Sequence, residues 1–180
     1  MTVPRYVLDA CVLVPPVLCD CLLRVAGAGL FRPLWSARIL GEWAHAAARR
    51  GAGSADAAIA RALAAFPAAM VAPAPGIEAR LHLPDPGDIH VLATAISGSA
   101  DAIVTWNAAD FPRGVLAGEG LARRDPDGLL WELWSHAPDL VGSALEGVRA
   151  EAARRAGAPV ALAPLLKRAG LTRLARAVSG

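Results

Sequence analysis

LPDPGDIHVLATAI, residues 83–96, combines a helix start with an acidic residue beside an apolar helix face. Asp85 followed by Pro86 predicts an N-cap and a first helical position, because a carboxylate accepts bonds from the free amides there and proline has no N–H to satisfy. Apolar residues then recur at helical spacing and predict a helix that packs inward. They are Val91, Leu92, Ala95 and Ile96. Asp88 lies on the buried side of this helix, where a carboxylate is costly unless it is paired. We therefore expect Asp88 to have a function and Asp85 to act mainly as a cap.

Length and composition predict one domain with room for a small appendage, because 180 residues are enough for a sizeable core. No uncharged apolar run of about 18 residues occurs, so no membrane span is expected. Asp9 interrupts the first apolar run, which excludes a signal peptide and makes a cytoplasmic protein the expectation. The formal net charge of +2 does not by itself indicate nucleic acid. Cys11, Cys19 and Cys21 do not have the spacing of a zinc site, so free thiols are expected.

Short apolar runs alternate with helical segments along the first 135 residues. The predicted strands cover residues 6–8, 31–35, 70–71, 102–105 and 121–123. The predicted helices cover residues 12–26, 36–47, 54–66, 85–96 and 125–134. Strands that alternate with helices indicate parallel βα units, and hence an α/β fold with both faces of a parallel sheet covered. From residue 136 onward the pattern is helical only, with amphipathic segments at 140–155 and 164–178. We therefore predict a domain over residues 1–135 and a helical C-terminal extension over residues 136–180.

Acidic and amide side chains fall where the predicted strands end. Asp9 ends the first strand, and Asn107 and Asp110 follow the strand at 102–105, while Glu42 and Asp88 lie on helices that would pack on the sheet. Ligand sites of open parallel sheets form at the carboxyl ends of strands where the topology reverses. Carboxylates that converge there repel one another and favour a bound cation. Oxygen ligands without His or Cys indicate Mg²⁺ or Mn²⁺, which can activate water for attack at phosphorus.

These residues stand in the order of a known family. The motifs LD at 8–9, Glu42, DxxVLATA at 88–95 and IVTxNxxDF at 103–111 together resemble the PIN domain, especially that of VapC-like bacterial toxins. The resemblance covers about residues 5–135. It implies a three-layer α/β/α fold with a parallel sheet and a metal-dependent ribonuclease that uses Mg²⁺ or Mn²⁺. It also implies an RNA substrate, an antitoxin partner and a homodimer as candidate partners, with no membrane association.

The resemblance also implies which residues act. Asp9, Glu42 and Asp88 would form the main catalytic and metal-binding site, with either Asn107 or Asp110 as the fourth member. We favour Asp110 as that member, with Asn107 close by. The C-terminal helices make the chain longer than a minimal toxin and resemble a longer PIN-like subgroup, in which Asp85 would join the acidic rim as an accessory residue.

Arginine and tryptophan side chains near Glu42 and the last strand are candidates for RNA binding. Arginine binds phosphate bidentately, and an aromatic ring can stack on an unpaired base. The candidate arginines are Arg24, Arg32, Arg38, Arg49 and Arg50, and we select Arg38 and Arg49. Trp35 and Trp106 are the candidate stacking residues, and we select Trp106. For His45 and His90 we expect hydrogen-bonded or exposed side chains rather than general bases.

Two other functions compete with the ribonuclease. An aspartate-dependent phosphatase needs a second aspartate two residues after its nucleophile, and Cys11 occupies that place after Asp9. A non-catalytic PIN-like RNA-binding or scaffolding protein stays open for a different reason. The family commonly has a small Ser, Thr or Asn where this chain has Cys11, and a thiol is a poor hydrogen-bond donor.

Overall fold

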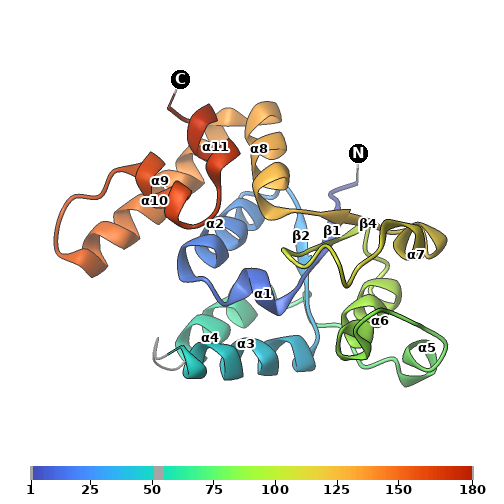
Figure 1. Cartoon of the computed structure of the whole chain (residues 1–180). Helices are drawn as coiled ribbons and strands as arrows, with labels where there is room; N and C mark the ends of the chain where they lie inside the picture. Colours follow the sequence, from blue (N-terminus) through green and yellow to red (C-terminus); the bar gives the residue numbers. More distant parts are fainter. Residues whose placement is uncertain (1, 51–54, 180) are drawn as a thin grey trace. The chain divides into compact units, whose positions relative to one another are not determined.

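The computed structural model describes residues 2–50 and 55–179 of the chain (Figure 1). The chain forms two compact units, one made of Met1–Val14 and Phe31–Arg124 and the other of Pro15–Leu30 and Asp125–Gly180. We refer to them as unit 1 and unit 2. They do not divide at residue 135, because one early helix belongs with the C-terminal helices in unit 2. A nuclease domain over residues 1–135 with a helical extension over residues 136–180 stays a prediction. Residue 54, where the predicted helix 54–66 begins, lies outside the described residues.

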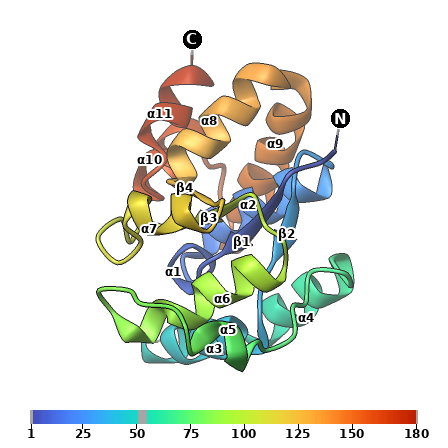
Figure 2. The same ribbon diagram turned by 90° about the vertical axis from the view of Figure 1, so that its right-hand side faces the viewer.

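Unit 1 contains an all-parallel sheet of four strands in the order β2-β1-β3-β4 (Figure 2). The strands are β1 (Arg5–Leu8), β2 (Arg32–Leu34), β3 (Ala102–Val104) and β4 (Ala122–Arg124). In the centre, Val7 of β1 lies opposite Leu34 of β2 and Ile103 of β3. The chain goes from β1 to β2 on one side and then crosses to β3 on the other side. The topology therefore reverses between β1 and β3, and a ligand site is expected beyond the ends of these two strands.

The predicted strand at residues 70–71 is wrong. Met70 forms only an isolated bridge with Trp35. Its neighbours contribute two hydrogen bonds, from Trp35 N to the carbonyl of Ala69 and from Val71 N to the carbonyl of Trp35. The proline-rich segment that follows prevents the chain from extending this pairing, since proline has no N–H to donate.

Seven helical segments of unit 1 lie among the described residues. They are α1 (Ala10–Leu13), α3 (Ala37–Arg49), α4 (Asp56–Ala65), α5 (Pro75–Glu78), the 3₁₀ helix η1 (Pro86–Asp88), α6 (Ile89–Ser97) and α7 (Arg113–Gly118). Ser36 caps α3 as its position suggests, with its hydroxyl accepting from the amide of Ile39 at 3.3 Å. The predicted helix 12–26 is two helices, because α1 ends before the Pro15–Pro16 pair and Pro16 opens the next helix.

The predicted helix 85–96 begins as expected but with a tighter first turn. The Asp85 carboxylate accepts from the amide of Gly87 at 2.7 Å, and Pro86 occupies the first helical position. The turn that follows is η1 rather than α-helix, a common start for a helix. Asp88 ends that turn and makes no side-chain cap bond to α6.

Unit 2 is helical. Its helices are α2 (Pro16–Gly27), α8 (Pro126–His136), α9 (Pro138–Ala156), α10 (Leu162–Arg168) and α11 (Thr172–Ala177). Asp125 caps α8 through the amide of Gly128 at 2.7 Å, as the Asp–Pro pair predicts. The predicted helical pair after residue 136 is instead three helices, because Gly170 adopts a left-handed conformation with φ of 83° and ends α10.

A buried carboxylate holds the last helix of unit 2. Asp127 accepts from the amides of Arg173 at 2.8 Å and Leu174 at 3.0 Å, at the start of α11. These bonds satisfy amides that a helix leaves free at its first turn. None of the described helices is long and apolar enough to cross a membrane.

Candidate metal centre

Asp9 is the first acidic residue at the reversal point of the sheet. It follows β1 directly, its amide donates to the carbonyl of Val104 at 3.1 Å, and its side chain is buried. The Thr105 hydroxyl donates to Oδ2 of Asp9 at 2.7 Å, and the Cys11 thiol donates to the same oxygen at 3.2 Å. Two side chains, one from each side of the reversal point, therefore fix the orientation of the Asp9 carboxylate.

Thr105 is a residue that the sequence analysis missed as part of the site. It follows β3 directly, and its hydroxyl also accepts from the amide of Asn107 at 2.9 Å. Its position immediately after a predicted strand was a usable signal. Its pairing with Asp9 depends on β1 and β3 being neighbours, which the sequence alone does not show.

Cys11 is a neutral hydrogen-bonding group here. Burial, with a further contribution from the nearby charge of Asp9, raises the pKa of its thiol to about 12. The sulfur accepts from the amide of Trp106 at 3.4 Å and lies 3.3 Å from Oγ1 of Thr105. The thiol thus stays protonated at neutral pH, and the stronger donor to Asp9 is the Thr105 hydroxyl.

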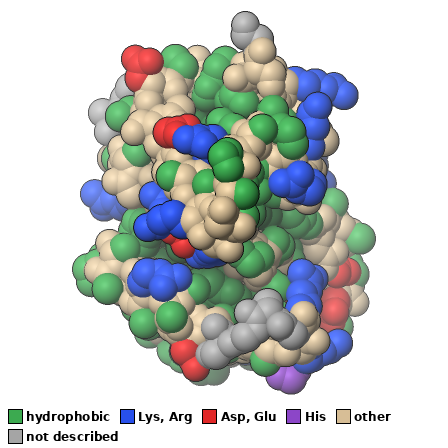
Figure 3. Space-filling view, turned by 90° about the vertical axis from the view of Figure 1, so that its left-hand side faces the viewer, with side chains coloured by type: hydrophobic (Ala, Val, Ile, Leu, Met, Phe, Trp, Pro, Cys, Tyr) green, Lys and Arg blue, Asp and Glu red, His purple; other side chains and the backbone are tan. Residues whose placement is uncertain are grey.

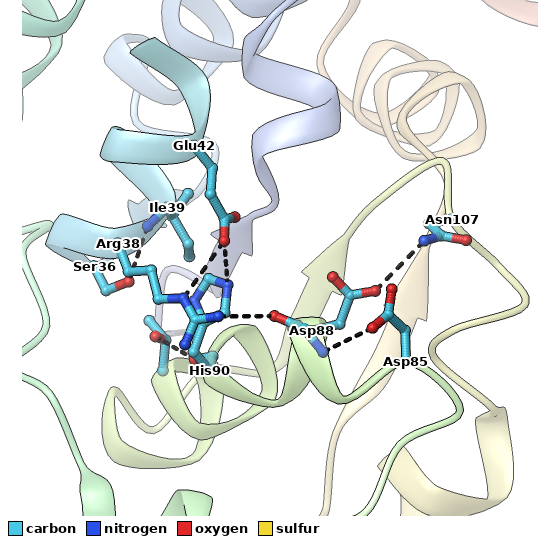
Figure 4. A network of polar contacts seen from close by, with 10 residues as sticks. Ser36, Arg38, Ile39, Glu42, Asp85, Asp88, His90 and Asn107 are labelled. Atoms are coloured by element: carbon cyan, nitrogen blue, oxygen red, sulfur yellow. Dashed lines mark hydrogen bonds and ion pairs between the residues drawn. The ribbon is translucent and has the colours of Figure 1, made fainter. Parts of the chain in front are cut away.

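Three carboxylates form a close cluster on the other side of this site. Among the described residues, oxygens of Asp85, Asp88 and Asp110 lie within 4.8 Å of one another. The Asn107 side chain amide donates to Oδ2 of Asp88 at 3.5 Å and makes a short contact with Oδ2 of Asp110. Figure 4 shows the Asp85 and Asp88 carboxylates side by side, with Asn107 facing Asp88. Asp85, which was predicted as an accessory residue, therefore both belongs to the cluster and caps η1.

The electrostatics of Asp88 show that the other acids are close to it. Its pKa is raised to about 6, first by burial and then by the charges of Asp9, Asp85, Asp110 and Glu42. Ionising Asp88 is therefore costly in the absence of a cation. The donor set is made of carboxylate oxygens, the hard ligands that Mg²⁺ and Mn²⁺ prefer. The cluster fits a divalent metal ion both in donor chemistry and in charge.

Glu42 reaches the same region from α3. Burial raises its pKa, and the guanidinium of Arg38, with Nε 3.6 Å from Oε1 of Glu42, partly offsets that effect. The charge of Asp9 raises the pKa of Glu42 further, which places these two acids within electrostatic range. Arg38 also donates to the carbonyl of Gly87 at 3.5 Å and so connects α3 with η1.

His90 is buried beside Glu42 and is neither exposed nor hydrogen-bonded through its ring, contrary to our expectation. It is only 3% exposed, and its Nε2 lies 2.8 Å from Oε1 of Glu42 in a geometry that does not form a hydrogen bond. Neither ring nitrogen has a hydrogen-bond partner among the described residues. Burial, with the charge of Arg38, lowers the pKa of His90 to about 4, so the ring is neutral at neutral pH. Figure 4 shows His90, Arg38 and Glu42 grouped next to the acidic cluster.

The candidate RNA-binding residues have different surroundings. Trp106 is 41% exposed and follows Thr105 of the site, whereas Trp35 is fully buried, so the suggestion that Trp35 stacks on a base is wrong. Arg38 and Arg49 are exposed on α3, and Arg24 belongs to unit 2, where it pairs with Asp20 at 2.9 Å. Figure 3 shows the described Lys and Arg side chains of one face in several separate groups between apolar side chains. The roles of Arg38, Arg49 and Trp106 stay predictions.

The protein is therefore an α/β protein with a parallel sheet. A group of carboxylates of the kind that binds divalent metal ions lies beyond the point where the topology of this sheet reverses. A model of the PIN domain matches residues 5–109. The chain therefore belongs to the PIN domain family, whose members are typically metal-dependent nucleases, and the predicted family and fold class are confirmed. No curated protein and no solved structure matches the chain significantly. The catalytic assignment of Asp9, Glu42, Asp88 and Asp110 stays a prediction.

Proposed function

We propose that the protein is a metal-dependent endoribonuclease and the toxin of a type II toxin–antitoxin pair. The observation that carries the nuclease part is the acidic cluster, in which oxygens of Asp85, Asp88 and Asp110 lie within 4.8 Å of one another. Burial and the charges of these acids, together with those of Asp9 and Glu42, raise the pKa of Asp88. Such a concentration of negative charge is unfavourable without a cation, and a divalent cation held there would supply positive charge to a phosphodiester substrate. Its place beyond β1 and β3 is where an α/β sheet offers room for a ligand.

In this proposal Asp85, Asp88 and Asp110 hold Mg²⁺ or Mn²⁺, with Asp9 and Glu42 completing the acidic site. When bound, the metal supplies a Lewis acid for the attack of water on a phosphodiester. Thr105 and Cys11 keep the Asp9 carboxylate in one orientation, and Asn107 holds Asp88 and Asp110 next to each other.

Positive and aromatic side chains then bind the substrate. Arg38 and Arg49 bind phosphates of the RNA, and the exposed ring of Trp106 stacks on an unpaired base. A single-stranded or looped RNA is the substrate that offers both contacts. A cytoplasmic location accompanies this function.

Cleavage of single-stranded RNA with and without metal tests the nuclease. The wild-type protein should cut with Mg²⁺ or Mn²⁺ and stop when EDTA is added. Asp9→Asn, Glu42→Gln and Asp88→Asn should each remove most activity, because each lowers the charge at the site with little change in shape. Asp139→Asn is the matched control, since Asp139 is exposed on α9 in unit 2. Wild-type cleavage by Asp88→Asn under excess RNA would show that the proposed site is wrong.

The non-catalytic alternative rested on Cys11 in place of a small polar residue. The Thr105 hydroxyl donates a hydrogen bond to Asp9 at 2.7 Å, so the Asp9 carboxylate has a strong donor although the Cys11 thiol is a poor one. The same assay separates the two functions, because a scaffolding protein would bind RNA in gel shifts and leave it intact with either metal.

The toxin role and its partners need separate tests. Induced expression in bacteria should arrest growth, and the Asp88→Asn variant should relieve the arrest. Co-expression with the neighbouring reading frame should neutralise the wild-type protein if that frame encodes the antitoxin. Light scattering of the purified protein tests whether it forms the homodimer expected as a candidate partner from the sequence.

A further inference from the structure

The loop after β3 carries two of the site residues, Asn107 and Asp110. Its beginning is fixed by the bond from the Asn107 amide to the Thr105 hydroxyl, and its end by Phe111, whose side chain is fully buried. Between these points the loop is held from outside by one side chain of the neighbouring strand, Arg123 of β4.

Arg123 bridges two main-chain carbonyls of this loop. Its Nη1 donates to the carbonyl of Ala108 at 2.6 Å and to the carbonyl of Phe111 at 2.9 Å. These carbonyls lie on either side of Asp110 in the chain. Arg123 itself is anchored because its backbone pairs with Ile103 in the sheet. The guanidinium therefore connects the rigid part of unit 1 to the backbone that carries Asp110.

We propose that Arg123 is a positioning residue for the metal centre, which sets the Asp110 carboxylate toward Asp85 and Asp88. The inference rests on the proposed function, because it assumes that these acids bind a divalent cation. Residues that orient metal ligands from outside typically change metal affinity by about 10- to 100-fold when they are removed. The hydrogen bonds of Arg123 go to carbonyls whose positions determine where the Asp110 side chain begins.

The charge of Arg123 makes the direction of the effect informative. A positive side chain near an acidic site repels a bound cation, so removing the charge alone should strengthen Mn²⁺ binding. Removing the bridge should weaken it, because Asp110 is then held less well. The two effects have opposite signs, so a net loss of affinity in a folded variant cannot come from the change in charge.

Titration calorimetry with Mn²⁺ on the whole chain tests this without any cleavage assay. Arg123→Met should weaken Mn²⁺ binding by about 10- to 100-fold. Arg123→Lys should bind Mn²⁺ more tightly than Arg123→Met but more weakly than wild type, because lysine keeps the charge and a donor but loses the planar guanidinium that bridges the two carbonyls. Arg113→Met is the control, because Arg113 is an exposed residue at the start of α7 and its removal changes the charge alone. Circular dichroism and a thermal melt establish that each variant is folded.

A double-variant cycle separates positioning from a general effect on the fold. In an Asp110→Asn background, Arg123→Met should cost little further affinity, because the ligand that it positions is already altered. Equal or tighter Mn²⁺ binding by Arg123→Met would overturn the inference, as would an undiminished loss in the Asp110→Asn background. If Arg123→Met does not fold, Arg123→Lys compared with Arg113→Met decides, with wild-type affinity in both overturning the inference. Absence of Mn²⁺ binding by the wild-type protein would overturn the proposed function as well.

Discussion

Neutralising Asp88 should stabilise the metal-free protein. The pKa of Asp88 rises from its ordinary 3.8 to about 6, so the folded state binds this proton more tightly than the unfolded chain. A difference of two pKa units corresponds to about 3 kcal/mol, and partial solvent exposure of this half-buried carboxylate reduces it to about 1 to 2 kcal/mol. Asp88→Asn removes this penalty, and no cap bond is lost because the Asp88 side chain does not cap α6. For a chain of this size the gain corresponds to a rise in Tm of about 2 to 8 °C.

The pH dependence follows from the raised pKa of Asp88. The penalty is absent below pH 3.8, grows as the pH rises toward 6 and is complete above it. Thermal melts in EDTA should therefore show Asp88→Asn more stable than wild type at pH 7.5, with the difference shrinking as the pH is lowered toward 4. In millimolar Mn²⁺ the order should reverse, because wild type gains binding free energy that the variant loses. Asp139→Asn, outside the cluster, should show no gain. If Asp88→Asn melts at or below the wild-type temperature in EDTA at pH 7.5, the shared-charge argument is wrong.

Two further predictions concern RNA binding and unit 2. Arg38→Ala and Arg49→Ala should each weaken RNA binding in EDTA and reduce the slope of log affinity against log salt by about 1. The control Arg155→Ala, which removes an ion-pair partner of Glu151, should change neither the affinity nor the slope. Equal losses of RNA affinity in all three variants would contradict a local arginine patch. Asp127→Ala should destabilise the protein by about 2 kcal/mol or more in urea unfolding, because two amides of α11 lose a charged acceptor; an unchanged midpoint would show that α11 does not depend on this bond.

Local features of the sequence predicted local structure well. The Asp–Pro pairs at 85–86 and 125–126 open helices as expected, because capping involves only residues a few positions apart. The break between α10 and α11 had a comparable local signal in Gly170, which follows basic residues at the end of a helical segment, and it was overlooked. Residues 70–71 failed as a strand because pairing, and not composition, decides whether two apolar residues become part of a sheet.

The parts of the site that were not predictable depend on contacts between distant segments. The sequence predicted an exposed or hydrogen-bonded His90, yet the residue is buried next to Glu42 of α3. Thr105 and Asp9 meet only because β1 and β3 are neighbours in the sheet. The strand order that decides this cannot be obtained from residues on one strand. Asp88 could be selected from the sequence because a carboxylate beside an apolar helix face is costly. Asp9 and Asp110 could be selected because they follow predicted strands.

Two aspartates lie at the beginning of α6, and only Asp85 has a capping role. Asp85 accepts a hydrogen bond from the amide of Gly87, and glycine suits this close approach, since a Cβ at residue 87 would lie 3.0 Å from Oδ1 of Asp85. Because Asp85 satisfies the helix start, Asp88 is left without a capping role at the point where η1 joins α6. Its carboxylate instead lies near other carboxylates, which costs stability. Among the described residues, the only side-chain donor to this carboxylate is the Asn107 amide, at 3.5 Å. Capping of this helix start requires only the carboxylate of Asp85. The second aspartate is therefore not explained by capping, and the charge around it supports the proposal that a divalent cation binds here.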